Sequence, residues 1–385
     1  MPKKVIILGA TGSIGTSAID VVRTHPEDFS VVAVSAFRSR EKCEALARAF
    51  GAKAYVGEDA ALRAVEENDA DVCLVATVGV SGLRPTLAAI EKGMDVALAT
   101  KEVLVMAGEL VTARARAKGV RFLPVDSEHS AIFQCLGDGE GAVAMRRTVD
   151  RLILTASGGP FLDGPEDLTT VTVEQALNPP RWKMGPKVTV DSSTMMNKGF
   201  EILEARWLFD VPVDRIDVVV HPESVVHSLV TFTDGSTLAQ LCPPDMRVPI
   251  QYALSWPDRL PAERAELDLA ALGSLTFRRP DPVRFPCLRL AKEACAAGGC
   301  ETAVLAAADE WAVDAFIKGM IGYTDIARTV EETLAKAPRF EMTSLEAVFE
   351  ATAWTLDHLT SSLTSASNVS CPTSNVSCLT SKVPV

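Results

Sequence analysis

The amino-acid sequence predicts an α/β protein whose N-terminal part is a Rossmann-like parallel sheet. Over residues 1–100, apolar segments typical of buried strands alternate with helical stretches, and the first strand runs directly into a glycine-rich turn. Both features are typical of a doubly wound sheet that binds a dinucleotide. The strands are expected at residues 4–9, 29–36, 52–56, 71–77 and 95–100.

Composition narrows the class of protein. The chain has 385 residues, of which 48% are hydrophobic and 23% charged, so two or three globular domains are expected. A net charge of -12 makes nucleic acid and anionic membranes poor candidates as main partners. The nine cysteines form no CxxC pair, which favours reduced thiols. Since the N-terminus starts directly into a strand, without a signal peptide, a cytoplasmic location is expected.

The first glycine turn, GATGSIG, stands between a strand and a helix that is expected to run through Val22. Glycine lets the backbone approach a pyrophosphate, and the helix N-terminus stabilises the pyrophosphate charge. The spacing GxxGxxG is a variant of the usual dinucleotide fingerprint. Its predicted cofactor-binding residues are Gly9, Thr11, Gly12, Ser13 and Ile14.

The end of the second strand indicates which dinucleotide is preferred. An NAD-binding protein usually has an acidic residue there, whereas this chain reads SAFRSR, with Arg38 and Arg40 and no acid. Arginine pairs with a ribose 2′-phosphate, which a carboxylate would repel, so NADP(H) is favoured. The alternative is that both arginines only solubilise the loop.

A pair of acidic residues follows the strand expected at residues 120–125. On an extended segment, Asp126 and Glu128 would point to the same side and begin a site for Mg²⁺ or Mn²⁺. Glu201 is the candidate for a third ligand. The alternative is that the pair caps a helix at residues 131–136. His129 is expected to pack or form hydrogen bonds rather than bind the cation.

The segment 178–204 carries the second group of candidate residues. Its prolines predict a loop, which bears Trp182 and Met184, followed by a short strand at residues 187–190. The hydroxyl-rich run DSST then precedes a helix expected from Met195 to Phe209. Helix-start NH groups, hydroxyls, Asn197 and Lys198 suit a phosphate. Ordinary capping by the hydroxyls and a solvated glutamate are the alternative.

The rest of the chain predicts a second sheet and a helical end. Further strands are expected at residues 149–155, 216–220, 225–232 and 236–241, with the turn Ser157-Gly158-Gly159 after the first of them. His227 lies among apolar neighbours, so a core histidine is a serious alternative to a functional one. A connector is expected at residues 257–286, and helices at residues 288–297, 302–318, 324–334 and 344–359. The Ser/Thr-rich residues 361–385 suggest a disordered tail.

In their order along residues 3–358, these motifs resemble the 1-deoxy-D-xylulose 5-phosphate reductoisomerase family. The shared segments are GATGSIG, GLRPTLAAIEKG, VDSEHSAIFQCL, TASGGPF, VTVDSSTMMNKGFEILEARWLF, HPESVVHS and LAQLCPPDMRVPI. The resemblance implies NADPH- and metal-dependent rearrangement and reduction of 1-deoxy-D-xylulose 5-phosphate to 2-C-methyl-D-erythritol 4-phosphate. It also implies a homodimer.

The resemblance further implies three domains: a Rossmann-like NADPH domain at 1–122, an α+β catalytic domain at 123–256 and, after the connector, a helical bundle at 287–360. It implies catalytic roles for Lys101, Asp126, Glu128 and Glu201, the last three as ligands of Mn²⁺ or Mg²⁺. The substrate would also meet Ser127, Ser157, Trp182, Met184, Ser192, Asn197, Lys198 and His227. Cofactor contacts would include Arg38, Ser39, Thr100, Glu102 and Gly185.

Several positions depart from the family pattern. Pro179 replaces a histidine at the start of the substrate flap, and Thr100 replaces an asparagine before Lys101. The other departures are Phe37, Ser39, Val103, Cys242, Ala306 and Asp309. Two alternatives follow: a related NADPH-dependent oxidoreductase acting on another phosphorylated sugar, or a catalytically silent NADP(H)-binding protein.

Overall fold

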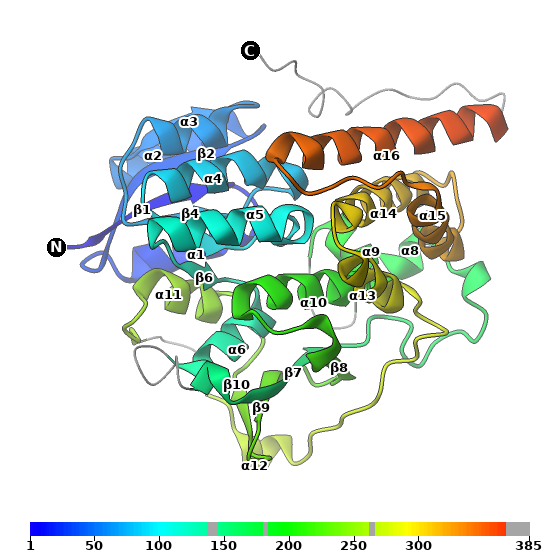
Figure 1. Cartoon of the computed structure of the whole chain (residues 1–385). Coiled ribbons are helices and arrows are strands. Elements are labelled where there is room, and N and C mark those ends of the chain that lie inside the picture. The colour runs from blue at the N-terminus through cyan, green and yellow to red at the C-terminus, as the bar shows by residue number, and fades with distance from the viewer. Residues whose placement is uncertain (138–144, 180–183, 262–265, 367–385) are drawn as a thin grey trace.

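A computed structural model describes residues 1–137, 145–179, 184–261 and 266–366 of the chain (Figure 1). The N-terminal part is a six-stranded sheet in the order β3-β2-β1-β4-β5-β6, and its neighbouring strands pair in parallel. The predicted α/β class and its strands are confirmed. The strands are β1 (Lys3–Leu8), β2 (Phe29–Ala36), β3 (Lys53–Val56), β4 (Val72–Val75), β5 (Asp95–Leu98) and β6 (Phe122–Pro124).

Helices cover both faces of this sheet. Along β1, Ile6 and Leu8 pack into one hydrophobic cluster, whereas Val5 and Ile7 pack into another. Alternate side chains of a strand point to opposite faces, so an uninterrupted apolar run predicts burial on both. The helices of this part are α1 (Ser13–Thr24), α2 (Arg40–Phe50), α3 (Ala60–Glu66), α4 (Leu83–Glu91) and α5 (Glu102–Lys118), with a 3-10 turn η1 (Gly79–Gly82).

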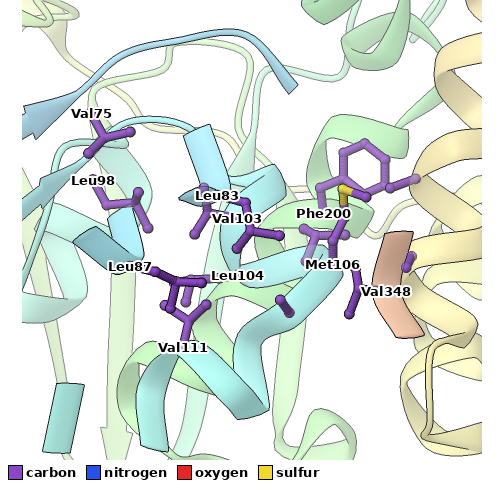
Figure 2. Close-up of a cluster of buried hydrophobic side chains, with 14 of the residues drawn as sticks. Val75, Leu83, Leu87, Leu98, Val103, Leu104, Met106, Val111, Phe200 and Val348 are labelled. Carbon is purple, nitrogen blue, oxygen red and sulfur yellow. The ribbon is translucent and has the colours of Figure 1, made fainter. Parts of the chain in front are cut away.

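One hydrophobic cluster joins the N-terminal sheet to the rest of the molecule. Figure 2 shows side chains of α4 and α5, among them Leu104 and Met106, in the same cluster as Phe200 and Val348. Phe200 belongs to α10 (Met196–Phe209) and Val348 to α16 (Leu345–Ala366). A core shared in this way holds α10, which carries Glu201, in a fixed position against α5, which follows Lys101.

The central part contains a second, four-stranded sheet in the order β10-β9-β7-β8. The pair β7–β8 is parallel, whereas β9 runs antiparallel to both β7 and β10. The bounds are β7 (Val149–Ala156), β8 (Ile216–Val220), β9 (Val226–Phe232) and β10 (Thr237–Leu241), which confirms the four strands predicted there. The accompanying helices are α6 (Ser127–Leu136), α8 (Val173–Ala176) and α9 (Pro186–Thr194), with 3-10 turns η2 (Leu168–Thr170) and η3 (Val213–Arg215).

The C-terminal part is helical, as predicted. In Figure 1, α10 runs through the middle of the molecule, between α5 and the central sheet, with the C-terminal helices at its far end. The helix α11 (Arg247–Ser255) instead returns to the N-terminal part and shares its hydrophobic cluster with β1. The remaining helices are α12 (Leu269–Leu272), α13 (Cys287–Ala297), α14 (Glu301–Ile317) and α15 (Tyr323–Lys336).

Three expectations about individual elements are corrected. The strand predicted at residues 187–190 is part of α9, because Gly185 is the N-cap and Pro186 starts the helix with a fixed backbone angle. The run DSST therefore ends α9, although the Thr194 hydroxyl still accepts from the backbone NH of Met196 at 3.3 Å, and Met195, in a left-handed conformation (φ 63°), separates α9 from α10. The tail predicted to begin at residue 361 is helical as far as Ala366, while the remainder of it lies outside the described residues.

None of the helices in the described residues combines the length and the apolar character that crossing a bilayer requires.

Candidate active site

Three carboxylates converge where α6 and α10 meet. Asp126 is the N-cap residue of α6, Glu128 lies in its first turn and Glu201 lies on α10. One oxygen of each carboxylate lies within 4.8 Å of the others. The predicted convergence is confirmed, but its reason was wrong, because Glu128 is helical rather than extended. The capping alternative is not supported either, since the side chain of Asp126 makes no capping hydrogen bond.

Two lysines stand among these carboxylates. The Lys101 Nζ lies 2.6 Å from Asp126 Oδ2 and 3.1 Å from Glu201 Oε1. The Lys198 Nζ donates to Glu128 Oε1 at 2.8 Å and also pairs with Glu201 Oε2. The two ammonium groups therefore neutralise part of the charge of three carboxylates. One negative charge is left over in the cluster.

The electrostatic balance of the cluster appears in its pKa shifts. Burial alone would lower the pKa of Lys101, but the carboxylates of Asp126 and Glu201 hold that pKa well above its ordinary value. Burial would raise the pKa of Asp126, and the Lys101 ammonium outweighs it and holds that pKa below its usual range. Glu128 differs, because burial and the neighbouring Glu201 raise its pKa despite Lys198. Glu128 is thus the carboxylate whose charge is least compensated.

Further contacts fix the orientation of Glu201. Asn197, one helical turn earlier, donates from Nδ2 to Glu201 Oε1 at 2.6 Å and accepts from Lys101 at 2.8 Å. His129 donates from Nε2 to the backbone carbonyl of Glu201 at 2.8 Å. These contacts place the carboxylate before any ligand arrives, which reduces the ordering cost of binding.

His129 and Glu204 form a second, fully buried pair behind the carboxylates. Nε2 of His129 donates to the backbone carbonyl of Glu201. The other ring nitrogen, Nδ1, lies 3.3 Å from Glu204 Oε2. Burial raises the pKa of Glu204 to about 7, with His129 opposing this rise. Among the described residues, neither His129 Nδ1 nor the two carboxylate oxygens of Glu204 has a hydrogen-bond partner. The expected packing and hydrogen-bonding role of His129 agrees with this geometry.

The donor set suits a hard divalent cation. Carboxylate oxygens are the preferred ligands of Mg²⁺ and Mn²⁺, and three of them face one another here. The excess negative charge and the raised pKa of Glu128 are what a cation between these groups would relieve. Asp126, Glu128 and Glu201 therefore fit the predicted cation, although their role as its ligands stays a prediction.

Residues predicted for the substrate phosphate come together from separate elements. Ser157 follows β7, and the next two glycines have positive φ angles of 88° and 66°. A Cβ on Gly159 would lie 2.9 Å from the carbonyl oxygen of Ser192, so glycine lets this turn approach the end of α9. Asn197 and Lys198 begin α10 directly afterwards. Their proximity agrees with a shared anion site, and their binding roles stay predictions.

His227 lies on β9, beside the end of β7. The Thr155 hydroxyl of β7 bonds the backbone carbonyl of His227 at 2.8 Å. The His227 side chain is only 5% exposed and donates from Nε2 to the carbonyl of Cys242 at 3.2 Å. The burial and the hydrogen bond of His227 therefore agree with the alternative that it is a core histidine. Its proximity to the Ser157 turn also agrees with the predicted substrate-side role.

The flap residues are only partly described. Met184 is half-buried at the start of α9, whereas Trp182 lies outside the described residues. Gly185 accepts a hydrogen bond from the Thr189 hydroxyl at 2.9 Å as α9 begins. Ser127, the other substrate-side residue, donates to Glu128 Oε2 at 2.5 Å.

The glycine-rich turn between β1 and α1 has the backbone geometry that dinucleotide binding needs. A Cβ on Gly9, whose φ is 76°, would lie 2.2 Å from the carbonyl oxygen of Ala76. A Cβ on Gly15 would lie 2.2 Å from the carbonyl oxygen of Gly9. Gly12 caps α1 without a side-chain bond, and Ser13 is exposed. The N-terminus of α1 is thus open to an anion. Thr11 and Ile14 flank this opening.

Four other predicted cofactor residues also lie at the carboxyl edge of the sheet, whereas Gly185 is the N-cap of α9. Arg38 follows β2, with its guanidinium 5.4 Å from the centre of the Phe37 ring, and Ser39 is the N-cap of α2. Thr100 is buried, and its hydroxyl donates to the carbonyl of Thr77 at 2.7 Å. Glu102 begins α5. The Thr100 hydroxyl is therefore committed to the backbone, and its cofactor contact stays untested.

Family models cover most of the chain. The model described as 1-deoxy-D-xylulose 5-phosphate reductoisomerase matches residues 5–56 and 47–108, and its C-terminal domain model matches residues 122–209. A third, the DXP reductoisomerase C-terminal domain, matches residues 241–358. A reductoisomerase of Pseudomonas savastanoi pv. phaseolicola is 48% identical over 382 residues, covering 91% of this chain and 96% of that protein. The chain belongs to the 1-deoxy-D-xylulose 5-phosphate reductoisomerase family.

Solved reductoisomerases agree with this membership. The enzyme from Zymomonas mobilis, in complex with NADPH, is 40% identical with a TM-score of 0.87, covering 94% of this chain and 99% of that one. A second reductoisomerase, in complex with NADPH, fosmidomycin and magnesium, is 38% identical with a TM-score of 0.88 and covers 94% and 98%. The reductoisomerase of Exiguobacterium sibiricum is also 48% identical, over 91% of this chain and 97% of that one.

Some residues of the reductoisomerase site were not found from the sequence. His129 and Glu204 were not predicted as a buried pair, because His129 was expected ahead of a helix at residues 131–136, whereas it lies within α6. Lys187 was read as part of a strand, so its ion pairs with Asp191 and Asp309 were missed. Cys242 was noticed only as a departure from the family. No local sequence pattern predicts its contact with His227, because the two residues are brought together by the pairing of β9 with β10.

Proposed function

We propose that this chain converts 1-deoxy-D-xylulose 5-phosphate to 2-C-methyl-D-erythritol 4-phosphate, using NADPH and a divalent cation, in non-mevalonate isoprenoid biosynthesis. The observation that carries the proposal is the convergence of Asp126, Glu128 and Glu201 beside Lys101 and Lys198. The solved relatives with NADPH and magnesium support the same cofactors. Fosmidomycin, bound in another relative, supports a sugar-phosphate site.

Asp126, Glu128 and Glu201 would hold Mg²⁺ or Mn²⁺. Bound there, the cation would act as a Lewis acid that polarises the substrate ketone and its neighbouring hydroxyl. Lys101 is placed to donate to the same substrate oxygens, because its Nζ already lies among these carboxylates. Asn197 keeps Glu201 oriented, and Ser127 is within reach of a substrate hydroxyl beside Glu128. The chain thus supplies charged groups and hydrogen-bond donors around the substrate ketone.

The substrate phosphate would bind near Lys198, on the side of that residue away from the proposed cation. Ser157, Ser192, Asn197, Lys198 and His227 supply hydroxyl, amide and cationic groups that suit a phosphate dianion. Binding energy from this remote group orients the reacting carbons. Trp182 and Met184, on the segment before α9, would close over the substrate and exclude water from the cleaved fragments.

NADPH would supply the hydride that reduces the rearranged aldehyde. Gly9, Thr11, Gly12, Ser13 and Ile14 would bind its pyrophosphate at the start of α1. Arg38 and Ser39 would bind the ribose 2′-phosphate, and their position after β2, at the same edge of the sheet, supports this role. Thr100, Glu102 and Gly185 would line the nicotinamide side.

The test follows NADPH absorbance with 1-deoxy-D-xylulose 5-phosphate, with Mn²⁺, with Mg²⁺ and with EDTA. We expect oxidation that depends on the cation and on the substrate, and much weaker turnover with NADH. A matched variant, R38E, is expected to lose the preference for NADPH while keeping cation dependence. Oxidation only with a different phosphorylated sugar, or NADPH binding without any turnover, would contradict the proposed reaction.

We also propose that the enzyme is a cytoplasmic homodimer. The edge strand β10 leaves Thr237, Leu238 and Ala239 exposed, with Leu238 45% exposed, which suits a contact between copies. The cysteines that the structure describes are free thiols, as in a reducing compartment. Light scattering should give twice the chain mass of 41.1 kDa. A monomer at that mass would contradict the dimer without touching the proposed reaction.

The proposed domain boundaries rest on the same support. We propose a catalytic domain at 123–256 and a helical domain at 287–360; one family model begins near the first of these boundaries, at residue 122, whereas the model at 241–358 spans the connector. The NADPH domain would span 1–122 and the connector 257–286. Since α11 packs with β1, residues 247–255 would stay with the NADPH domain if the parts separate.

A further inference from the structure

Cys242 makes a close contact with the imidazole of His227. Its Sγ lies 3.2 Å from His227 Nε2, and the same nitrogen lies 3.2 Å from the carbonyl oxygen of Cys242. The backbone nitrogen of Cys242 donates to Val225 at 3.1 Å, which fixes the cysteine next to β9. His227 is 5% exposed, whereas Cys242 is partly exposed. An imidazole held over a thiol that solvent can reach is the arrangement of an activated cysteine nucleophile.

The electrostatics of Cys242 differ from those of the other described cysteines. Burial raises the pKa of the thiols of Cys43, Cys73, Cys135, Cys287, Cys295 and Cys300. Burial acts on Cys242 too, but the hydrogen bond to His227 outweighs it and lowers its pKa. For His227, burial would lower the pKa, and the bond to Cys242 raises it. Each partner thus favours the charged form of the other.

Charged groups on the neighbouring elements act on the same pair. Glu128 of α6 also favours protonated His227, whereas Asp245, in the segment after Cys242, disfavours the thiolate. These two influences oppose each other, so the 3.2 Å contact between sulfur and imidazole decides the balance. The pair lies beside the end of β7, because Thr155 bonds the backbone of His227.

We propose that Cys242 is a reactive thiol, activated by His227, that hydroperoxides oxidise reversibly and whose oxidation stops turnover. The thiolate sulfur attacks one peroxide oxygen, so that an S–O bond forms and the O–O bond breaks. The second oxygen leaves as hydroxide and takes a proton from His227 Nε2 to give water. Sulfur loses two electrons and becomes a sulfenic acid, and the peroxide is reduced. Dithiothreitol restores the thiol through a mixed disulfide, releasing water.

The effect on turnover rests on the proposed function, in which His227 lies on the phosphate side of the substrate. Oxidation adds an oxygen beside the imidazole and removes the thiolate that stabilises its proton. The expected kinetic signature is therefore a raised KM for the sugar phosphate, with a smaller change in kcat. The thiol chemistry itself does not depend on what the enzyme converts.

The first experiment compares the full-length protein with the variants C242A and C135A. Cys135 is a matched control, because it is also partly exposed, while burial raises its pKa to about 11. After limited hydrogen peroxide, we expect wild type and C135A to lose activity and to regain it with dithiothreitol. C242A should lose activity about tenfold more slowly. Equal loss in C242A, or loss that dithiothreitol does not restore, would overturn the proposal.

The second experiment measures the thiol without any assay of turnover. Iodoacetamide labelling is followed by peptide mass spectrometry, which separates Cys242 from Cys371 and Cys378, both outside the described residues. At pH 7 we expect Cys242 to be alkylated about tenfold faster than Cys135. In the H227N variant the labelling of Cys242 should require higher pH. Slow labelling of Cys242 in the wild type, or an identical pH profile in H227N, would exclude activation by the imidazole. This result does not depend on whether the enzyme converts 1-deoxy-D-xylulose 5-phosphate.

Discussion

Two buried ionic clusters contact α10, one through Lys198 and Glu201 and the other through Phe200, and they differ in how much of their charge is exposed. The first combines Asp126, Glu128 and Glu201 with Lys101 and Lys198. In the second, Lys187 Nζ of α9 lies 2.5 Å from Asp191 Oδ2 and 2.8 Å from Asp309 Oδ2 of α14. Both contain one more carboxylate than ammonium group. Charge count alone therefore does not tell a binding site from a structural contact.

Access to solvent separates them. In the first cluster the side chains of Asp126 and Glu128 keep 14% and 18% of their surface exposed. In the second, the carboxyl groups of Asp191 and Asp309 are 3% and 0% exposed. The ammonium group of Lys187 also lies 4.6 Å from the centre of the Phe200 ring, in the shared core. The first cluster therefore exposes carboxylates to solvent, whereas in the second only the Lys187 side chain, 24% exposed, reaches solvent while its two carboxyl groups are enclosed between α9 and α14.

The largest effect should follow from a change in the accessible cluster. E201Q removes one charge and one cation ligand, so we expect turnover to fall on the order of 10³-fold, equivalent to about 4 kcal/mol. E204Q, one turn further along α10, is the matched control. Glu204 pairs with His129 and is not among the three proposed ligands, although its carboxylate also lies within 4.8 Å of Asp126, so its variant should lose much less. Titration with Mn²⁺ and steady-state rates measure both. Equal losses in the two variants would refute the assignment of ligands.

The second effect tests the closed cluster. K187M leaves two buried carboxylates without their cation, and we expect the free energy of unfolding to fall by about 3–5 kcal/mol. K318M is the control, because Lys318 pairs with Asp314 on the exposed side of α14. Its loss should be no more than about 1 kcal/mol, because exposed ion pairs contribute little. Urea unfolding followed by circular dichroism compares them. If K187M is as mild as K318M, the buried contact does not hold α9 to α14.

The same comparison shows what the sequence can and cannot predict. The strands of the first sheet and the turn after β1 were predicted because their residues are consecutive and their apolar pattern is local. Asp126, Glu128 and Glu201 were predicted from residue chemistry and from family motifs, although Glu128 was expected on an extended segment. Their contacts with Lys101 could not be predicted from the sequence, because they depend on how the separate elements pack together.

The closed cluster escaped prediction for a physical reason. The alternation Val188-Thr189-Val190 resembles a strand, but Pro186 after Gly185 starts a helix whose buried face includes Thr189, Val190 and Asp191. Lys187 then meets Asp309, which is 122 residues away in the sequence. Contacts at that separation arise from the packing of α9 on α14, and no local pattern encodes them.

The smallest expected effect is a pH dependence of the free energy of unfolding, which arises from the second cluster. Burial and the neighbouring Asp309 hold the pKa of Asp191 well above its ordinary value, despite Lys187. The folded protein therefore binds this proton more tightly than the unfolded chain. The stability it contributes is complete below the ordinary pKa, about 4, and is lost as the pH rises toward the raised value.

D309N leaves one carboxylate for one ammonium group, so the pKa of Asp191 should move back toward its ordinary value. Relative to wild type, the variant should then gain about 1 kcal/mol in free energy of unfolding between pH 5 and pH 8. D314N, at an exposed position of the same helix, should show no such slope. Urea unfolding at both pH values measures the difference. A D309N curve parallel to wild type would mean that Asp309 does not raise the pKa of Asp191.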